Sequence, residues 1–349
     1  MNQLAFTKSF LFKYMFRSGY LLLPAIVGLS IFLNASWAQA PAQGRMLRPL
    51  LLTHVVENLE SSIDFYRQGL QFEVAEGPAR LTSSALLQKV VAETPAAQAR
   101  YAIMSIPGSA LSLQLIEFEG AEGRPFQQRL YDPGVTRFSI QVRDIDLAFE
   151  RVKDTVMSVD TISAGPVYTQ RPRNNTRAVM LRDPDGFVFE FVQSGNPIQT
   201  EVPESSNIYD ARSSLALENI ERAMEFYGEI LGFVATREPG YVNDAVLALE
   251  GTPRARARNM GTMPPGSANP WFFWEFRDIV RTKRSPDPQD PGASAITLQV
   301  ENIEALVNRI HEAGHIIETP GGQPVRLDNN SEAILVRSPD GLLVELVEF

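Results

Sequence analysis

Residues 182–192 read RDPDGFVFEFV, and residues 337–347 read RSPDGLLVELV, so one distinctive stretch occurs twice in the chain. Pro-Asp-Gly predicts a tight turn, because proline restricts φ and glycine allows positive φ, and the apolar segment after it predicts a strand. Each strand keeps a glutamate four residues after the glycine, Glu190 in one copy and Glu345 in the other. A carboxylate inside an apolar strand is costly unless something pairs with it, so these two glutamates point to a functional site.

The duplication extends well beyond this stretch. Residues 58–66 (NLESSIDFY) match residues 219–227 (NIERAMEFY), and residues 138–145 (FSIQVRDI) match residues 296–303 (ITLQVENI). The offsets are 161, 158 and 155 residues, so the copies differ only by short loop changes. Such a constant period indicates repeated structural units.

A smaller pattern recurs inside each copy. An alternating strand leads to Asn58 or Asp144, which predicts a helix start because such side chains accept a bond from an early helical N–H. Further alternating segments follow each helix, so each half of a copy reads strand–helix–strand–strand–strand. We expect domains at residues 46–195 and 208–349, joined by a polar, proline-containing linker at residues 196–207.

The first forty residues predict a secretory signal peptide. Lys8, Lys13 and Arg17 precede a predominantly apolar run at residues 21–33, and small residues follow at signal-peptidase spacing. The run is shorter than the roughly 20 residues of a membrane-spanning helix. We expect cleavage after Ala38 rather than Ala40, with a periplasmic or secreted product that keeps no stable membrane insertion; an uncleaved anchor is the alternative.

Composition excludes several functional classes. The absence of cysteine excludes disulfides, thiolate metal sites and cysteine nucleophiles. The formal net charge is −9, and loss of the three leader cations takes it to −12. So acidic a protein is a poor binder of nucleic acid, and we expect a small molecule as its partner.

The helix ending at residues 226–233 (FYGEILGF), the Asn or Asp helix starts, and the Pro-Asp-Gly-x-x-x-Glu strands together resemble the vicinal oxygen chelate superfamily. This group contains glyoxalases, bleomycin-resistance proteins and extradiol dioxygenases, and the resemblance covers about residues 46–349. It implies an α+β fold of two tandem glyoxalase-like domains, each with two βαβββ halves that form a cupped mixed-sheet half-barrel. It also implies a divalent metal, held by first-strand residues about seven positions before the helix cap and by the glutamate of the last strand.

Only part of that metal-binding pattern is present in this sequence. Glu190 and Glu345 match the last-strand position, but the residues seven before the four helix caps are Leu51, Arg137, Arg212 and Ala295. None of these ligates a metal, since arginine stays protonated. The metal site is therefore predicted to be degraded and no cofactor is favoured. If a divalent metal is bound, Glu190, Glu345 and His54 are its candidate ligands.

The two arginines suggest a replacement for the metal. Arg137 and Arg212 are predicted to pair with Glu190 and Glu345, because a buried carboxylate needs a partner and a guanidinium offers a bidentate one. Three interpretations stay open: a structural pair, a pair that also anchors an anionic ligand such as a carboxylate, and arginines unrelated to the glutamates.

Four further residues complete the candidate cavity: Gln114, Glu275, Trp271 and Phe273. Residues 271–276 read WFFWEF, and alternation places Trp271, Phe273 and Glu275 on one face of the strand. His54 stands four positions before its cap, which turns it away from Leu51 and favours a core histidine, unless a bulge reverses the face.

The sequence therefore predicts an exported glyoxalase-like protein that binds a small organic ligand without a metal. A divalent-metal-dependent lyase, isomerase or ring-cleaving dioxygenase is the alternative. A structural or assembly module that uses the aromatic strand at an interface is a third, and whether the protein forms a homodimer stays open. No catalytic residue is assigned.

Overall fold

Four βαβββ units follow one another along the chain, two in each sequence copy. The computed structural model describes residues 44–169, 175–328 and 330–349, and the predicted signal peptide lies outside them. Residues from Ala42 onwards belong to one compact unit. Within the described ranges, no helix is both long enough and apolar enough to cross a membrane.

The elements of each unit are as follows. The first unit contains β1 (Arg45–Val55), α1 (Leu59–Asp64) with a π-helical end (Phe65–Gly69), β2 (Glu73–Arg80), α2 (Ala85–Glu93), β3 (Gln98–Ser105) and β4 (Ser112–Glu119). The second contains β5 (Thr136–Val142), α3 (Ile145–Val152), β6 (Ser158–Val159), β7 (Val167–Tyr168), β8 (Arg177–Arg182) and β9 (Val188–Gln193). The third contains β10 (Ile208–Leu217), α4 (Ile220–Met224) with a π-helical end (Glu225–Ile230), β11 (Val234–Ala235), β12 (Gly240–Tyr241), α5 (Asp244–Leu249), β13 (Arg256–Met263) and β14 (Trp271–Arg277). The fourth contains β15 (Ser294–Glu301), α6 (Ile303–Glu312), β16 (Ile316–Ile317), a 3₁₀ turn (Pro320–Gly322), β17 (Val325–Arg326), β18 (Glu332–Arg337) and β19 (Leu343–Glu348).

The predicted helix caps are confirmed. The Asn58 side chain accepts a hydrogen bond from Ser61 N at 2.9 Å, and the Asp144 side chain accepts one from Leu147 N at 3.0 Å. Asn219 caps α4 in the same way. Each cap satisfies an N–H that has no partner inside its helix, which fixes where the helix begins.

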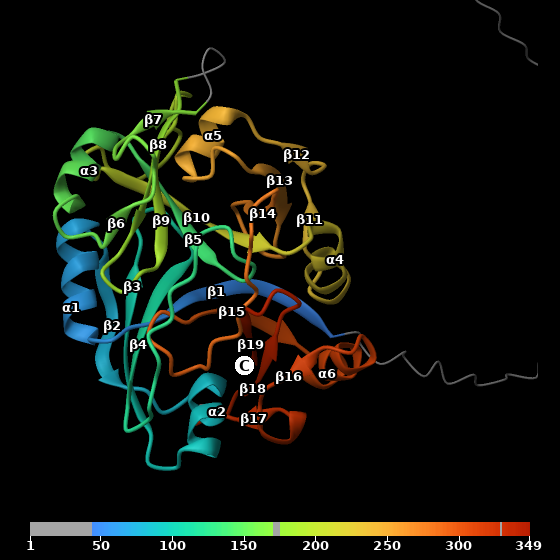
Figure 1. Cartoon of the computed structure of the whole chain (residues 1–349). Coiled ribbons are helices and arrows are strands. Elements are labelled where there is room, and N and C mark those ends of the chain that lie inside the picture. The colour runs from blue at the N-terminus through green and yellow to red at the C-terminus, as the bar shows by residue number, and fades with distance from the viewer. Residues whose placement is uncertain (1–43, 170–174, 329) are drawn as a thin grey trace, which may run out of the picture. The chain divides into compact units, whose positions relative to one another are not determined.

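Each of the two sheets combines one unit from each sequence copy. In the first sheet, β1 runs antiparallel to β15, with the order β16-β18-β19-β15-β1-β4-β3-β2. In the second sheet, β5 runs antiparallel to β10, with the order β11-β13-β14-β10-β5-β9-β8-β6. The α+β class is confirmed (Figure 1). Because the first unit pairs with the fourth and the second with the third, the two retained glutamates lie in different sheets.

The two faces of each sheet have different coverings. One face packs on α1, α3, α4 and α6 and forms the main apolar core, which includes Leu52, Phe138 and Leu298. The other face carries Glu190 or Glu345, and we call it the glutamate face. Helix α2 covers the glutamate face of the first sheet and α5 that of the second, each through its own apolar cluster. Figure 1 shows α2 beside β17 and β18, and α5 beside β7 and β8.

The repeated Pro-Asp-Gly stretches form the predicted tight turns. Gly186 has φ of +90° and Gly341 has φ of +96°, which only glycine adopts without strain. Each turn also has a second contact that the turn motif did not predict. Asp185 accepts hydrogen bonds from Glu57 N (3.0 Å) and the Ser62 hydroxyl (2.7 Å), so it joins the second unit to the start of α1 in the first.

Candidate functional site

The retained glutamates lie on inner strands of their sheets, beside hydroxyl side chains. In strand register, Ser139 on β5 stands next to Glu190 on β9, and Thr297 on β15 stands next to Glu345 on β19. These hydroxyl residues are five positions before the helix caps Asp144 and Asn302, not seven. The register neighbours of the two glutamates are therefore hydroxyl residues, and Arg137 lies two positions from Ser139, on the same face of β5.

On the first sheet, Glu345 serves as an anchor for helix α2. Its Oε1 accepts hydrogen bonds from the Ser84 hydroxyl (3.0 Å) and Ala85 N (2.6 Å), and its Oε2 accepts one from Thr297 (3.0 Å). Burial raises the pKa of Glu345, although these bonds act in the opposite direction. Both carboxylate oxygens are occupied by the protein itself, so this face has the features of a structural site.

On the second sheet, Arg137 is held in a buried ion pair. Its Nη1 lies 2.5 Å from Glu250 Oε2, and both side chains are almost fully buried, at 3% and 1% exposure. The guanidinium also stacks over Trp274, 4.4 Å from the ring centroid, which adds a cation–π contact. Glu190 hydrogen-bonds to the Ser139 hydroxyl on the neighbouring strand and remains partly exposed.

This ion pair leaves several polar groups without partners. Arg137 Nη2, Glu250 Oε1 and Trp274 Nε1 are buried and make no hydrogen bond to any described residue. Burial raises the pKa of Glu250 to about 7; Arg137 opposes this rise and the charge of Glu190 adds to it. A buried pair with one free donor and one free acceptor is costly for stability, and such groups gather at functional sites.

Both predicted arginine–glutamate pairs are wrong. Arg137 pairs with Glu250 and not with Glu190, because the segment after α5 places the Glu250 carboxylate 2.5 Å from the guanidinium. Arg212 pairs with Asp210, at 3.2 Å, and lies on the second sheet, whereas Glu345 lies on the first. The guanidiniums do not replace the metal as partners of the retained carboxylates.

The face of strand β14 that lies towards the site is the opposite of the one that the sequence predicted. Trp271 and Phe273 are 2% and 0% exposed and pack in the main core, with Phe233 and Tyr227 beside them. The assignment of these two residues to the candidate cavity is therefore wrong. Their neighbour Trp274 stacks on Arg137 instead, since alternate residues of a strand point to opposite faces.

Gln114 and Glu275 have different surroundings. Gln114 stands in register with Thr53 on the glutamate face of the first sheet and accepts its hydroxyl hydrogen bond at 3.0 Å. Glu275 faces the helices, where it accepts Ile220 N at 3.1 Å and binds Arg258 and Arg277, each at 2.5 Å. Glu275 therefore caps α4 and does not line the site.

His54 is a core residue, as the alternation predicted. Its ring stacks on Phe187 with centroids 3.6 Å apart, and its Nδ1 lies 3.3 Å from the Tyr66 hydroxyl. Tyr66 donates to Asp183 at 2.5 Å. Burial lowers the pKa of His54 to about 3, so the ring stays neutral. It points to the opposite face from Thr53 and is not placed to bind a metal with Glu345.

The donors on the glutamate faces do not fit a divalent metal. The second sheet offers Glu190, Ser139 and Ser214, and Glu250, which is paired with Arg137; the first offers Glu345 and Gln114 with two threonines that are already hydrogen-bonded. Zinc, calcium and magnesium take four to eight imidazole, carboxylate, carbonyl or water ligands. Among the described residues, no group of three or more His, Asp or Glu side chains is arranged to hold a metal ion.

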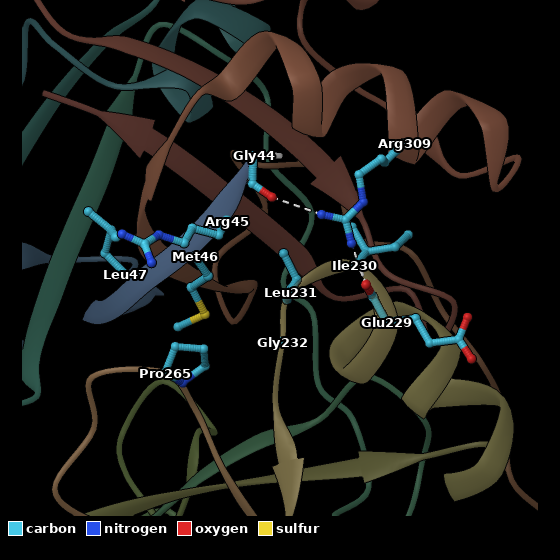
Figure 2. Close-up of a pocket in the computed structure, with 10 residues that line it drawn as sticks. All are labelled: Gly44, Arg45, Met46, Leu47, Glu229, Ile230, Leu231, Gly232, Pro265 and Arg309. Carbon is cyan, nitrogen blue, oxygen red and sulfur yellow. Dashed lines mark hydrogen bonds between the residues drawn. The ribbon is translucent and has the colours of Figure 1, made fainter. Parts of the chain in front are cut away.

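A groove of about 530 Å³ lies elsewhere, where the start of β1 meets α6 and the end of α4 (Figure 2). None of the predicted site residues lines it. The Arg309 guanidinium in this groove is already bonded to Gly44 O (2.8 Å) and to Glu229 O. The guanidinium in the groove is therefore satisfied by the protein, and no described lining residue has a buried side-chain polar atom without a partner.

Sequence reasoning missed Glu250. It follows α5 in a stretch, residues 245–250 (AVLALE), that carries no family motif. One weak signal was present: a carboxylate at the C-terminal end of an apolar helix is disfavoured by the helix dipole and needs another reason to be there. The partner of Arg137 is 113 residues away in sequence, so only the folded chain identifies it.

Comparisons with known proteins agree with this architecture. Glyoxalase I from Zea mays superposes with a TM-score of 0.55 at 17% identity, over 87% of this chain and 92% of that one. A putative dioxygenase from Bacillus subtilis subsp. subtilis str. 168 superposes with a TM-score of 0.52 at 15% identity, over 87% and 86%. At this identity the likeness shows the fold alone, and a search of curated protein sequences finds no match. The model of the Glyoxalase/Bleomycin resistance protein/Dioxygenase superfamily matches residues 50–191 and 212–346, and the chain belongs to that superfamily.

Proposed function

We propose that this protein binds a small organic molecule without a metal ion, on the glutamate face of the second sheet. The observation that carries the proposal is the Arg137–Glu250 pair, which lies beside Glu190 and Ser139 where the family pattern places a metal. Its unpaired buried donor, Arg137 Nη2, gives a ligand a hydrogen-bonding position that costs stability while it stays unused.

Only one of the two glutamate faces is assigned this role. Glu345 on the first sheet has all its oxygens bonded to Ser84, Ala85 and Thr297, and it is 5% exposed. A ligand there would have to displace the start of α2. On the second sheet Glu190 is partly exposed and, among the described residues, hydrogen-bonds to Ser139 alone. The two sheets of the duplicated chain have thus diverged, one towards structure and one towards binding.

Metal analysis tests the metal-independent part of the proposal. The protein is purified without chelators, and Mn, Fe, Ni and Zn are quantified by mass spectrometry. We expect less than about 0.1 metal ion per chain, because two carboxylates, one of them paired with Arg137, and hydroxyl neighbours are a poor donor set. A stoichiometric metal would overturn the proposal and favour the metal-dependent lyase, isomerase or dioxygenase.

Ligand binding is tested separately, by thermal-shift screening with a set of small anionic and neutral aromatic compounds. A ligand present at 100 times its Kd stabilises the folded state by about 2.7 kcal/mol, which gives a readily measured shift in Tm. We expect hits that are lost in the Arg137→Gln variant and kept in Arg256→Gln, a change at an exposed arginine on β13. Hits that survive the Arg137 change would place the binding site elsewhere.

We also propose that the protein is exported through the signal at residues 1–40. The basic, apolar and small-residue segments of the leader support this. N-terminal sequencing of protein recovered outside the cytoplasm is expected to give a chain that starts at Gln39. Recovery of the intact leader with the membrane fraction would favour the uncleaved anchor instead.

A further inference from the structure

Two features set Arg137 apart from a purely structural arginine. Its counter-ion, Glu250, comes from the segment after α5, which covers the sheet, and not from the sheet itself. Only one of the two terminal nitrogens of its guanidinium has a partner: Nη1 binds Glu250, while Nη2 has no partner among the described residues. A guanidinium normally binds a carboxylate through two parallel hydrogen bonds, so a monodentate contact leaves part of the interaction unmade.

Glu250 is poorly satisfied as well. Its Oε1 is buried without a partner in the described part of the chain. The charged groups that act on it are Arg137 on β5, Glu190 on β9 and Asp160 near β6, and the last two repel its charge. Burial raises its pKa to about 7, so near neutral pH a large share of molecules hold Glu250 in its uncharged form. Arg137 then has no anionic partner in direct contact.

From this geometry we propose that Arg137 anchors the carboxylate group of the ligand, and that Glu250 is an internal competitor for the same guanidinium. Trp274 stacks on the guanidinium and keeps an unpaired indole N–H, which favours a carboxylate attached to a flat apolar body. The ligand class is therefore a small aromatic or planar monocarboxylate. This inference rests on the proposed function, because it specifies what the same site binds.

Competition at one guanidinium has a definite consequence for the two partners. A ligand carboxylate reaches Arg137 only when Glu250 withdraws, and α5 is short, with six residues, and capped by Asn243. Loss of the Glu250 charge should favour the ligand, whereas loss of the Arg137 charge should remove its anchor. A purely structural ion pair predicts no gain in binding from either change.

The experiment is calorimetric titration of the full mature protein with sodium benzoate, with neutral benzamide as the comparison probe. We expect benzoate to bind wild-type protein and Glu250→Gln to bind it several-fold more tightly. Arg137→Gln should lose at least tenfold in affinity, since the charge-assisted hydrogen bond to the ligand carboxylate is removed. The control Arg256→Gln, at an exposed pair with Asp278, should match wild type.

Dependence on pH separates competition from simple packing. With Glu250 titrating at a pKa of about 7, wild-type affinity for benzoate should fall roughly tenfold from pH 6 to pH 8, because the competent fraction falls by that factor. Glu250→Gln should abolish this fall. If Arg137→Gln does not fold by circular dichroism, the Glu250→Gln and pH measurements decide the question on their own.

Each result has a clear reading. Three outcomes overturn the inference. They are weaker benzoate binding by Glu250→Gln than by wild type, equal wild-type affinity for benzoate at pH 6 and pH 8, and no benzoate binding at all. Binding of benzamide or another neutral compound without benzoate overturns the inference and leaves the proposed function standing. If no screened compound binds, the proposed function fails as well.

Discussion

Replacing Glu250 by glutamine should change how the stability of the protein depends on pH. Burial raises the pKa of this carboxyl from 4.5 to about 7, and such a rise corresponds to about 3 kcal/mol of preference for the uncharged form in the folded state. Between these two pH values the folded chain holds more protons than the unfolded chain. The stabilisation is therefore fully present below about pH 4.5 and is lost as the pH rises through about 7.

The assay is urea unfolding at pH 5 and pH 8, followed by the fluorescence of Trp271 and Trp274. Asp183 and Asp340 also have raised pKa values, of about 7 and about 6, so wild type should lose stability between these pH values for several reasons. The decisive quantity is the difference between variants. Glu250→Gln should lose about 2–3 kcal/mol less than wild type over this range.

Glu201→Gln, at an exposed loop position, is the matched control and should behave as wild type does. If wild type and Glu250→Gln lose the same free energy of unfolding between pH 5 and pH 8, the raised pKa of Glu250 is refuted. A uniform offset at both pH values would instead report a packing change, with no contribution from titration.

Three further predictions concern the rest of the framework. Glu345→Ala should lower the free energy of unfolding by about 2–3 kcal/mol, measured by urea unfolding, because it leaves Ala85 N buried without an acceptor; benzoate affinity should not change. Gly341→Ala should cost more stability than Gly186→Ala in the same assay. Both glycines have positive φ, but a Cβ at 341 would lie 2.3 Å from Arg284 O, whereas at 186 the nearest atom is a flexible side-chain carbon at 3.4 Å; equal costs would contradict this. Incubation with excess EDTA should leave the Tm within about 1 °C of its starting value by calorimetry, and a drop of several degrees would indicate a structural metal.

Much of the fold follows from local patterns in the sequence. The Asn58 and Asp144 caps, the positive-φ glycines of the repeated turn and the core position of His54 are each decided by neighbours within a few residues. Such features depend on backbone sterics and strand alternation, which short sequence windows carry. For that reason these predictions are confirmed.

The site residues could be predicted less well, for a physical reason. Register decides which side chains stand together, and a shift of two positions along β5 replaces Arg137 by Ser139 as the neighbour of Glu190. The sequence also did not decide which face of β14 lies towards the site, because both faces of the strand carry aromatic residues. Turn and strand motifs do not encode the covering helices, so Glu250 could not be assigned to Arg137.

By itself, the sequence determined the family, the four repeated units and the two glutamates that lie in the middle of last strands. Tertiary structure alone decided that the first unit pairs with the fourth and the second with the third, and that α2 and α5 cover the glutamate faces. The physical reason is that caps and turns depend on neighbours in the chain. The surroundings of a buried charge depend on segments more than a hundred residues away, as Arg137 and Glu250 demonstrate.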